Sequence, residues 1–232
     1  MTVLLRPFFT FYGAKWRAAI HYPRPEFPRL IEPFAGSAGY ALRHYERDVQ
    51  LYDVDPIVVG IWSYLIRTPS REIRNLPAHV HHVDDLHVCQ EARWLIGFWL
   101  NRGTQCPVKT PGAWMRSKQY PQQFWGTYVR RRLALQVEYI RHWRVRELHY
   151  LRVPNHAATW FVDPPYHRSG LHYSFPLTTY RSLARWCQAR MGQIIVCEQH
   201  GADWLPFVPF RTLKAHNGRY GKQTSREVVY IQ

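Results

Sequence analysis

Short apolar runs and helical patterns alternate in the first 66 residues. Residues 29–32 predict a short strand, and the glycine-rich run at residues 33–39 follows it. The pattern then predicts a helix to about Arg43 and a strand over residues 49–52, which ends at Asp53. A second helix is predicted over residues 56–66, because proline is favoured in the first turn of a helix. This order of strand, glycine-rich turn, helix, strand, acid and helix is typical of half a nucleotide-binding α/β fold.

The middle of the chain has a different pattern, with no clear parallel strand between residues 68 and 135. A helix is predicted over residues 91–100, followed by a loop rich in Pro, Gly, Gln and Lys over residues 104–123. A longer helix is predicted over residues 123–143, because apolar side chains recur there at helical spacing. This apolar stripe comprises Trp125, Val129, Leu133, Val137 and Ile140.

The α/β pattern resumes after this helix. Residues 159–162 predict a buried strand, Thr178 or Thr179 is expected to cap a helix, and residues 193–197 predict another strand. One face of the helix is expected to carry Tyr180, Leu183, Ala184, Cys187 and Met191. Residues 210–213 and 228–231 bracket a polar segment and predict a closing antiparallel pair.

These patterns predict the class and organisation of the fold. We expect an α/β protein with a Rossmann-like sheet, a terminal antiparallel strand pair and a small helical insertion. Residues 1–67 and 136–232 are expected to form the α/β core, and residues 68–135 the insertion.

Charge adds an expected partner. The 232 residues carry 31 basic and 16 acidic side chains, a formal net charge of +15. Such a surplus attracts polyanions, so nucleic acid is the first partner expected and an anionic membrane surface the second. Apolar runs such as residues 94–100 are too short to cross a membrane, and residues 3–5 are too short for a signal-peptide core.

The cysteines bear on redox compartment and metal binding. No paired short spacing occurs among Cys89, Cys106, Cys187 and Cys197. This argues against a disulfide scaffold and against a four-cysteine zinc site. We therefore expect an intracellular, cytoplasmic protein.

Two features at the first strand ends suggest a ligand site. Glycines in Glu32-Pro33-Phe34-Ala35-Gly36-Ser37-Ala38-Gly39 allow a tight turn and a close ligand, although an ordinary strand–helix turn explains them equally well. The run is neither GxGxxG nor an NTP-binding loop. Asp53 can accept both hydroxyls of a ribose, or cap the next helix, for which Asp55 is the better candidate.

The segment Asp163-Pro164-Pro165-Tyr166 follows an apolar strand. Its prolines cannot continue a strand ladder and stiffen the exit from the sheet. A carboxylate, a proline carbonyl and an aromatic face then lie together. Two acceptors and a stacking surface suit a planar base with an exocyclic amino group, although a strand-ending turn is the simpler reading of the segment alone.

Taken together, these motifs resemble those of the Dam-type DNA adenine N6-methyltransferase family, in its small phage-type members. Phe11-Tyr12-Gly13-Ala14-Lys15 resembles the N-terminal cofactor motif of that family, residues 32–39 its glycine-rich motif, Asp53 its ribose-binding acid, and Asp163 to Tyr166 its catalytic tetrapeptide. Residues 193–198 and 225–230 resemble its later strands. The resemblance covers roughly residues 7–66 and 140–232.

The resemblance implies S-adenosylmethionine (SAM) as the methyl donor, DNA as substrate, base flipping and no metal. It implies that residues 68–135 recognise the target. The catalytic residues implied are Asp163, Pro164, Pro165 and Tyr166. The cofactor-binding residues implied are Phe11, Tyr12, Gly13, Lys15, Phe34, Gly36, Gly39, Asp53 and Asp163.

Two positions depart from the family pattern. Ala14 stands where many members have a second glycine, and His149-Tyr150 stands where members often have Asp before Tyr. The second departure concerns a contact to the cofactor adenine. Glu147 is a candidate substitute for the missing acid.

Basic residues interleave with aromatic ones between residues 116 and 152, a pattern that suits phosphate contact and base stacking. A solvated helix face is the alternative. The nucleic-acid-binding residues expected are Arg116, Lys118, Arg130, Arg131 and Arg132. Trp114 is a further candidate for contact with a groove. The histidine-rich run at residues 79–87 lacks a metal-ligand spacing and more often forms a solvated or DNA-facing surface.

Three alternative functions stay open on the sequence. One is N4-methylation of cytosine, which uses the same amino chemistry, although Asp163 favours adenine. Another is methylation of adenine in RNA. The third is a nucleic-acid-binding protein with a decayed site, against which the intact Lys15, Asp53 and Asp163 argue.

Overall fold

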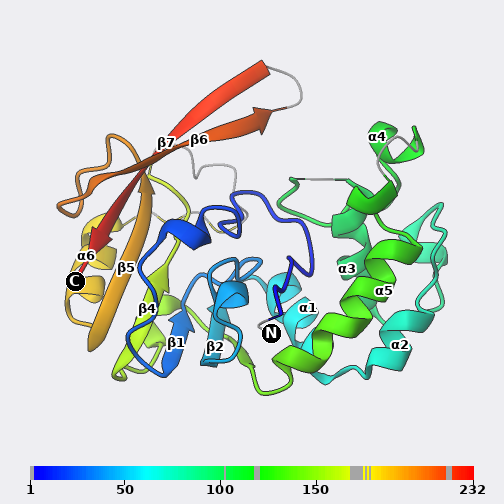
Figure 1. Cartoon of the computed structure of the whole chain (residues 1–232), viewed down its shortest axis with the longest axis horizontal. Coiled ribbons are helices and arrows are strands. Elements are labelled where there is room, and N and C mark those ends of the chain that lie inside the picture. Colours follow the sequence, from blue (N-terminus) through cyan, green and yellow to red (C-terminus); the bar gives the residue numbers. More distant parts are fainter. Residues whose placement is uncertain are drawn as a thin grey trace.

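A computed structural model describes residues 3–101, 103–117, 121–167, 175, 177, 179–217 and 221–232, with the backbone alone at residues 121, 213–217 and 221–225. Its centre is a seven-stranded sheet of strand order β3-β2-β1-β4-β5-β7-β6 (Figure 1). The strands are β1 Arg29–Glu32, β2 Asp48–Asp53, β3 Arg144–Glu147, β4 Ala158–Val162, β5 Gly192–Gln199, β6 Val208–Asn217 and β7 Gly221–Ile231.

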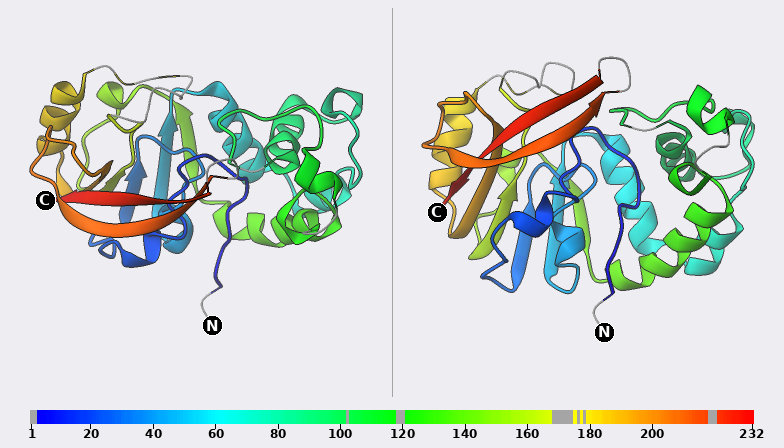
Figure 2. Two further views of the ribbon diagram at one scale, coloured as in Figure 1. Left: turned by 90° about the horizontal axis from the view of Figure 1, so that it is seen from above. Right: turned by 45° about the horizontal axis from the view of Figure 1, so that its top comes forward.

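The first five strands are parallel to one another. Leu30 of β1 pairs with Val49 of β2 on one side and with Thr159 of β4 on the other. β7 runs antiparallel to β5 and to β6. The predicted Rossmann-like sheet with a closing antiparallel pair is therefore confirmed. The β6–β7 hairpin extends past the carboxyl edge of the parallel strands, toward the side where α4 lies (Figure 2).

The helices lie on both sides of the sheet. In the described residues the α-helices are α1 Pro56–Arg67, α2 Ser70–Asn75, α3 Gln90–Leu100, α4 Ala113–Arg116, α5 Thr127–Gln136 and α6 Tyr180–Gln188. The 3-10 helices are Ala19–His21, Ala41–Arg43, Val83–Asp85, Pro121–Gln123, Val137–Ile140 and Tyr150–Arg152. None of these described helices has the length and apolar character needed to span a membrane.

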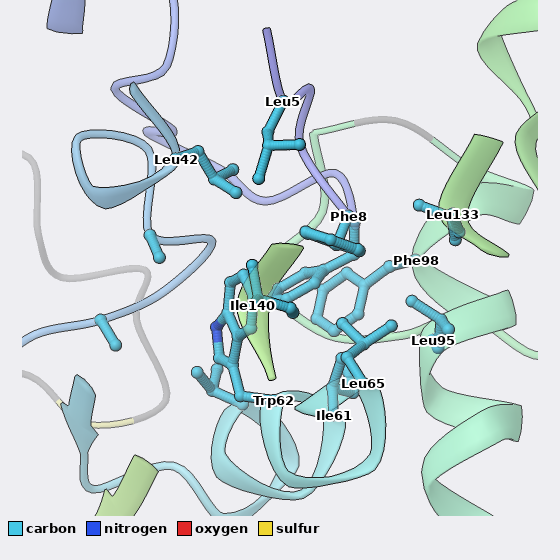
Figure 3. Packing of buried hydrophobic residues seen from close by; sticks show 14 of the residues in the cluster. Leu5, Phe8, Leu42, Ile61, Trp62, Leu65, Leu95, Phe98, Leu133 and Ile140 are labelled. Carbon is cyan, nitrogen blue, oxygen red and sulfur yellow. The ribbon is translucent and has the colours of Figure 1, made fainter. Parts of the chain in front are cut away.

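The hydrophobic core consists of two clusters. The larger one joins the N-terminal segment, α1 and the helices beside the sheet, and includes Phe8, Trp62, Phe98 and Leu133 (Figure 3). The smaller one packs α6 on β4 and β5 through residues such as Trp186. Helices α3 and α5 thus share one core with the N-terminal segment and α1, because apolar residues from all of them meet in the larger cluster.

The turn after β1 leads into a 3-10 helix, Ala41–Arg43, and not into the longer helix that the sequence predicted. Residues 33–40 form the turn, and β2 already begins at Asp48. Few residues are left for a helix between them. Residues 44–47 complete the connection as a bend. The N–H of His44 donates to the carbonyl of Ala41, and the N–H of Arg47 donates to the carbonyl of His44.

The helix predicted over residues 123–143 is shorter than expected. α5 covers Thr127–Gln136 and continues as the 3-10 helix Val137–Ile140. The predicted apolar stripe is confirmed, because all five of its side chains are buried. Its last step, from Val137 to Ile140, is three residues long, which matches the period of a 3-10 helix.

Strand β3 had no counterpart in the sequence prediction. Its four residues are mostly exposed, and it pairs in parallel with β2 at the edge of the sheet, with Asp53 opposite Glu147. Val145 packs against the larger core cluster, but the other three side chains are exposed, so pairing of the backbone with β2 holds most of this strand. The sequence therefore carries no periodic signal there.

Two details near the C-terminus also differ from prediction. Met191 lies beyond the end of α6 and is exposed, and Trp186 is buried on the inner face of the helix instead. Thr179 precedes α6 without a side-chain capping bond, and Thr178 lies outside the described residues. The closing strands are longer than predicted, because backbone pairing continues through most of the polar segment 214–226.

Candidate active site

A cavity of ≈ 380 Å³ opens at the carboxyl ends of β1, β2 and β4. This edge of a parallel sheet is where α/β proteins bind ligands. The cavity is lined by the turn after β1, by Asp53 and Asp163 at the next strand ends, and by the N-terminal segment 11–15. All the residues that the family resemblance assigned to the cofactor line it: Phe11, Tyr12, Gly13, Lys15, Phe34, Gly36, Gly39, Asp53 and Asp163.

The turn after β1 is held by neighbouring elements. Gly36 has a φ of +43°, in the left-handed region that glycine adopts without strain. Its carbonyl accepts a hydrogen bond from Trp62 Nε1 at 2.8 Å. The buried carboxylate of Glu32 accepts one from the N–H of Ala41 at 2.6 Å. The protein itself therefore sets the shape of this wall of the cavity.

Asp53 and Asp55 divide two roles between them. Asp55 accepts the N–H of Ile57 at 2.8 Å and caps α1, as predicted. Asp53 accepts the N–H of Asp55 and that of Gly36, both at 3.0 Å, which orients its carboxylate beside the turn. Burial raises the pKa of Asp53 to about 6, although these N–H donors lower it. Asp53 is thus a half-buried acid at the cavity wall and not the helix cap.

Gly39 lets the N-terminal segment approach the glycine-rich turn. A Cβ at this position would lie 2.5 Å from the backbone nitrogen of Trp16 and 2.9 Å from the carbonyl carbon of Lys15. Both atoms belong to backbone, which cannot move aside as a flexible side chain can. The glycine is therefore needed for Lys15 to reach the cavity.

We expect Gly39→Ala to lower the free energy of unfolding by about 1–3 kcal/mol, because the added methyl group forces the backbone at Lys15 and Trp16 away from the turn. Urea unfolding measures the change. Gly112→Ala is the matched control, since its Cβ would meet mainly the Asn101 side chain, at 3.2 Å. Equal stability of Gly39→Ala and the wild type would show that this close approach imposes no constraint.

Lys15 and Asp163 form an ion pair at one end of the cavity. Lys15 Nζ lies 2.9 Å from Asp163 Oδ1, donates to the carbonyl of Gly13 at 2.9 Å, and lies 4.7 Å from the centre of the Tyr166 ring. Burial alone would lower the pKa of Lys15, but the negative charge of Asp163 and its neighbours raises it well above the usual value. Burial raises the pKa of Asp163 to about 6, against the opposing effect of Lys15.

The predicted catalytic tetrapeptide follows β4 without extending it. Pro164 is buried, while Asp163, Pro165 and Tyr166 are half-buried. The hydroxyl of Tyr180, at the start of α6, donates to the carbonyl of Pro165 at 2.6 Å. This bond ties the turn to α6 and brings Tyr166 against the larger core cluster.

The wall of the cavity beyond Asp53 is aromatic. The rings of Phe34 and Tyr150 are tilted by 32°, with centroids 5.4 Å apart. His149 also lines the cavity. Glu147 is exposed and is not a lining residue, so the structure does not support it as the substitute acid.

Two buried glutamates near Tyr166 were missed from the sequence. Glu198 is the penultimate residue of β5. Glu227 in β7 accepts the hydroxyl of Tyr22 at 3.0 Å and that of Tyr166 at 3.4 Å. Each glutamate directly borders an apolar run, since Glu198 follows residues 194–197 and Glu227 precedes residues 228–229. That position is the signal that could have identified them, because a buried carboxylate needs donors.

The three arginines of the basic helix α5 lie in different surroundings. Arg130 donates to the carbonyl of Leu76. Arg132 donates to the carbonyl of Pro7 at 3.2 Å and lies 5.2 Å from the Trp99 ring, and burial lowers its pKa to about 10. Arg131 is exposed. Only Arg131 of the three therefore projects fully into solvent, because the other two guanidinium groups lie against the protein.

The remaining candidates for nucleic-acid contact lie in and near α4. Arg116 is exposed and donates to the carbonyl of Pro111. Trp114 is 61% exposed. Lys118 lies outside the described residues.

The histidine-rich run is bound to its surroundings by side-chain pairs. Asp84 lies 2.8 Å from Lys109 Nζ, and its N–H donates to His82 Nδ1 at 3.2 Å. Within the described residues, no group of three or more His, Cys, Asp or Glu side chains is arranged to hold a metal ion.

Comparison with known proteins adds little to this geometry. The sequence matches no protein-family model and no curated protein. Among solved structures, similar chains include a conserved hypothetical protein of Streptococcus pyogenes, with 10% identity, a TM-score of 0.37, and coverage of 87% of this chain and 84% of that chain.

Two further similar structures are described as candidate methyltransferases. The one from Escherichia coli is 13% identical, with a TM-score of 0.34 and coverage of 87% of this chain and 73% of that chain. The one from Haemophilus influenzae, a methylase, is 10% identical, with a TM-score of 0.34 and coverage of 87% and 85%. Similarity at this level supports no conclusion about function, which therefore rests on the chain's own topology and site.

Proposed function

We propose that the protein is a SAM-dependent methyltransferase that acts on the N6 amino group of adenine in DNA. The observation that carries the proposal is the pairing of Lys15 with Asp163 in a cavity that Asp53 also lines. These three groups come from the N-terminal segment, β4 and β2. Their meeting at one strand edge agrees with the site that the family resemblance implies.

The lining of the cavity fits SAM. The Asp53 carboxylate can accept ribose hydroxyls, the rings of Phe34 and Tyr150 offer an apolar surface for adenine, and Lys15 borders the cofactor. When bound, SAM supplies an electrophilic methyl group on a positively charged sulfur. The residues of the chain bind and orient it, and no metal is part of the proposal.

Asp163 and Pro164 are proposed to activate the target amine. The adenine amine is a poor nucleophile, because its lone pair is delocalised into the ring. If Asp163 and the Pro164 carbonyl accept its two N–H bonds, the nitrogen would become more tetrahedral and its lone pair would be free to attack the methyl group that SAM would supply. The proton then leaves N6 through Asp163 to water. This is catalysis by orientation and electrostatics.

The target base has to leave the duplex to reach this cavity. Flipping costs ~a few kcal/mol, and stacking on Tyr166 is proposed to offset part of it. Lys15 lies at one face of the Tyr166 ring, so the opposite face is the one proposed for the base.

Mass spectrometry of nucleosides tests the substrate. DNA and RNA are incubated separately with the protein and SAM and then digested. The expected product is N6-methyldeoxyadenosine, released from DNA. N4-methylcytosine from DNA, or N6-methyladenosine from RNA alone, would replace the proposal with one of its alternatives. No methylated nucleoside from any substrate, together with no SAM binding, would indicate a nucleic-acid-binding protein with a decayed site.

Asp53→Asn is expected to weaken SAM binding by about 5–100-fold, since it removes a charged acceptor at the cavity wall worth ~1–3 kcal/mol. Calorimetry in the presence of a chelator measures the affinity. Asp203→Asn is the matched control, because this aspartate is exposed and lies outside the cavity lining, so SAM affinity should stay unchanged. Equal affinity of Asp53→Asn and wild type would leave Asp53 with a structural role only.

The arginines of α5 are expected to separate into two classes. Arg131→Gln should make the dependence of log K on log salt less steep by about 0.9 on duplex DNA, because one phosphate contact is lost. Arg132→Gln should leave that slope unchanged and lower the melting temperature, because its guanidinium group packs on Trp99 and binds Pro7. DNA-binding titrations at several salt concentrations and thermal unfolding give both quantities. A lowered slope for Arg132→Gln alone would reverse the assignment.

A further inference from the structure

Within the part of the chain that the structure describes, the buried carboxylate of Glu198 accepts hydrogen bonds from three N–H donors. Glu198 is the penultimate residue of β5, its side chain is fully buried, and it is not among the cavity-lining residues. Oε1 accepts the N–H of Gln199 at 2.8 Å. Oε2 accepts the N–H of His167 at 3.1 Å and Trp204 Nε1 at 3.0 Å. Burial raises the pKa of Glu198, and these three donors lower it.

This donor set requires a carboxylate or another group with two acceptors. Backbone and indole N–H groups can only donate, so an amide in place of the carboxylate would turn its NH₂ group toward at least one of them. A glutamine at position 198 would therefore leave a buried donor unsatisfied. The same is not true of Glu227, whose partners are tyrosine hydroxyls that can also accept.

The bond to His167 lies next to the proposed stacking residue. His167 directly follows Tyr166, and the carbonyl of Pro165 directly precedes it. The Pro165 carbonyl accepts the Tyr180 hydroxyl at 2.6 Å, and the His167 N–H donates to Glu198. The backbone of Tyr166 is thus held on both sides, once by α6 and once by β5.

We propose that Glu198 is a positioning residue that sets the orientation of Tyr166 for base stacking. Glu198 acts through the N–H of His167, and Trp204, in the loop after β5, donates its indole N–H to the same carboxylate oxygen. The effect of Glu198 on catalysis rests on the proposed function. The hydrogen bond from His167 to Glu198 can be tested without any substrate.

The first measurement is amide hydrogen exchange at His167 by NMR. Glu198→Gln should speed exchange at His167, while Glu227→Gln should leave it unchanged. The second measurement is single-turnover methyl transfer to adenine in DNA. Glu198→Gln should lower this rate ~10–100-fold, because misplacing a positioned group by about 1 Å has an effect of that size. SAM affinity should stay within about threefold of wild type, since Glu198 lies outside the cavity lining.

A double substitution separates positioning from a general loss of structure. In a Tyr166→Ala background, Glu198→Gln should cause little further loss of rate, because the ring that it orients is gone. In a Tyr166→Phe background, which keeps the ring, its full effect should persist. Equal losses in both backgrounds would overturn the proposal.

The outcomes also distinguish this inference from the proposed function. If wild-type protein methylates adenine and Glu198→Gln alters exchange at His167 without altering the rate, the positioning role is wrong and the function stands. If wild-type protein methylates nothing, the function fails, whatever the exchange data show about His167. Unchanged exchange at His167 in Glu198→Gln would remove the physical basis of the inference.

Discussion

Asp163→Asn is expected to lower methyl transfer to DNA by about 10²–10³-fold, the size of effect that loss of one preorganised charged contact produces. Asparagine keeps the shape of the side chain but removes its charge. Its NH₂ group would face either the target amine or Lys15, which lies 2.9 Å from the carboxylate. The substituted side chain can then no longer draw a proton from the amine.

Single-turnover transfer of labelled methyl groups measures this rate. DNA affinity should change little, because phosphate contacts supply most of it. Asp203→Asn, which alters an exposed aspartate, is the matched control and should leave the rate unchanged. A rate for Asp163→Asn within tenfold of wild type would remove Asp163 from the catalytic role.

Lys15→Met is expected to shift the pH dependence of methyl transfer to higher pH. In the wild type the carboxylate of Asp163 is the active form, and its pKa is about 6, so kcat/KM should rise through that region. Lys15 lowers the pKa of Asp163. Removing the lysine charge therefore raises this pKa further, and the variant should lose activity near neutral pH and regain part of it at alkaline pH.

The control for Lys15→Met is Lys109→Met. Lys109 is an exposed lysine that also pairs with an aspartate, Asp84, at 2.8 Å. Lys109→Met should therefore leave the pH profile of methyl transfer the same as in the wild type. A Lys15→Met profile with the wild-type midpoint and a uniformly lower rate would mean that Lys15 binds a ligand without tuning Asp163. Glu198 and Glu227 also lie near this pair, so their glutamine variants identify any limb of the profile that belongs to them.

The sequence by itself determined the local features of this protein. Apolar runs marked β1, β2, β4 and β5, because buried parallel strands need apolar side chains on both faces. The glycine-rich turn, Asp53 and Asp163 were recognisable because each directly follows such a run. Parallel strands end at one edge, so their meeting there could be expected from the strand pattern alone. The stripe on α5 was found for the same reason, since burial imposes a period.

Only the tertiary structure decided what depends on contacts between distant segments. Strand β3 lies at an exposed edge and is held mostly by its backbone, so its side chains carry no pattern. Arg130 and Arg132 satisfy carbonyls of Leu76 and Pro7, which no helical wheel can indicate.

The same limit applies at the site. The Lys15–Asp163 pair and the bond from His167 to Glu198 join residues far apart in the chain. A charged side chain in a sequence does not reveal whether it is buried or what its partner is. Its pKa and its role follow from burial and from the donors around it, and these exist only once the chain has folded.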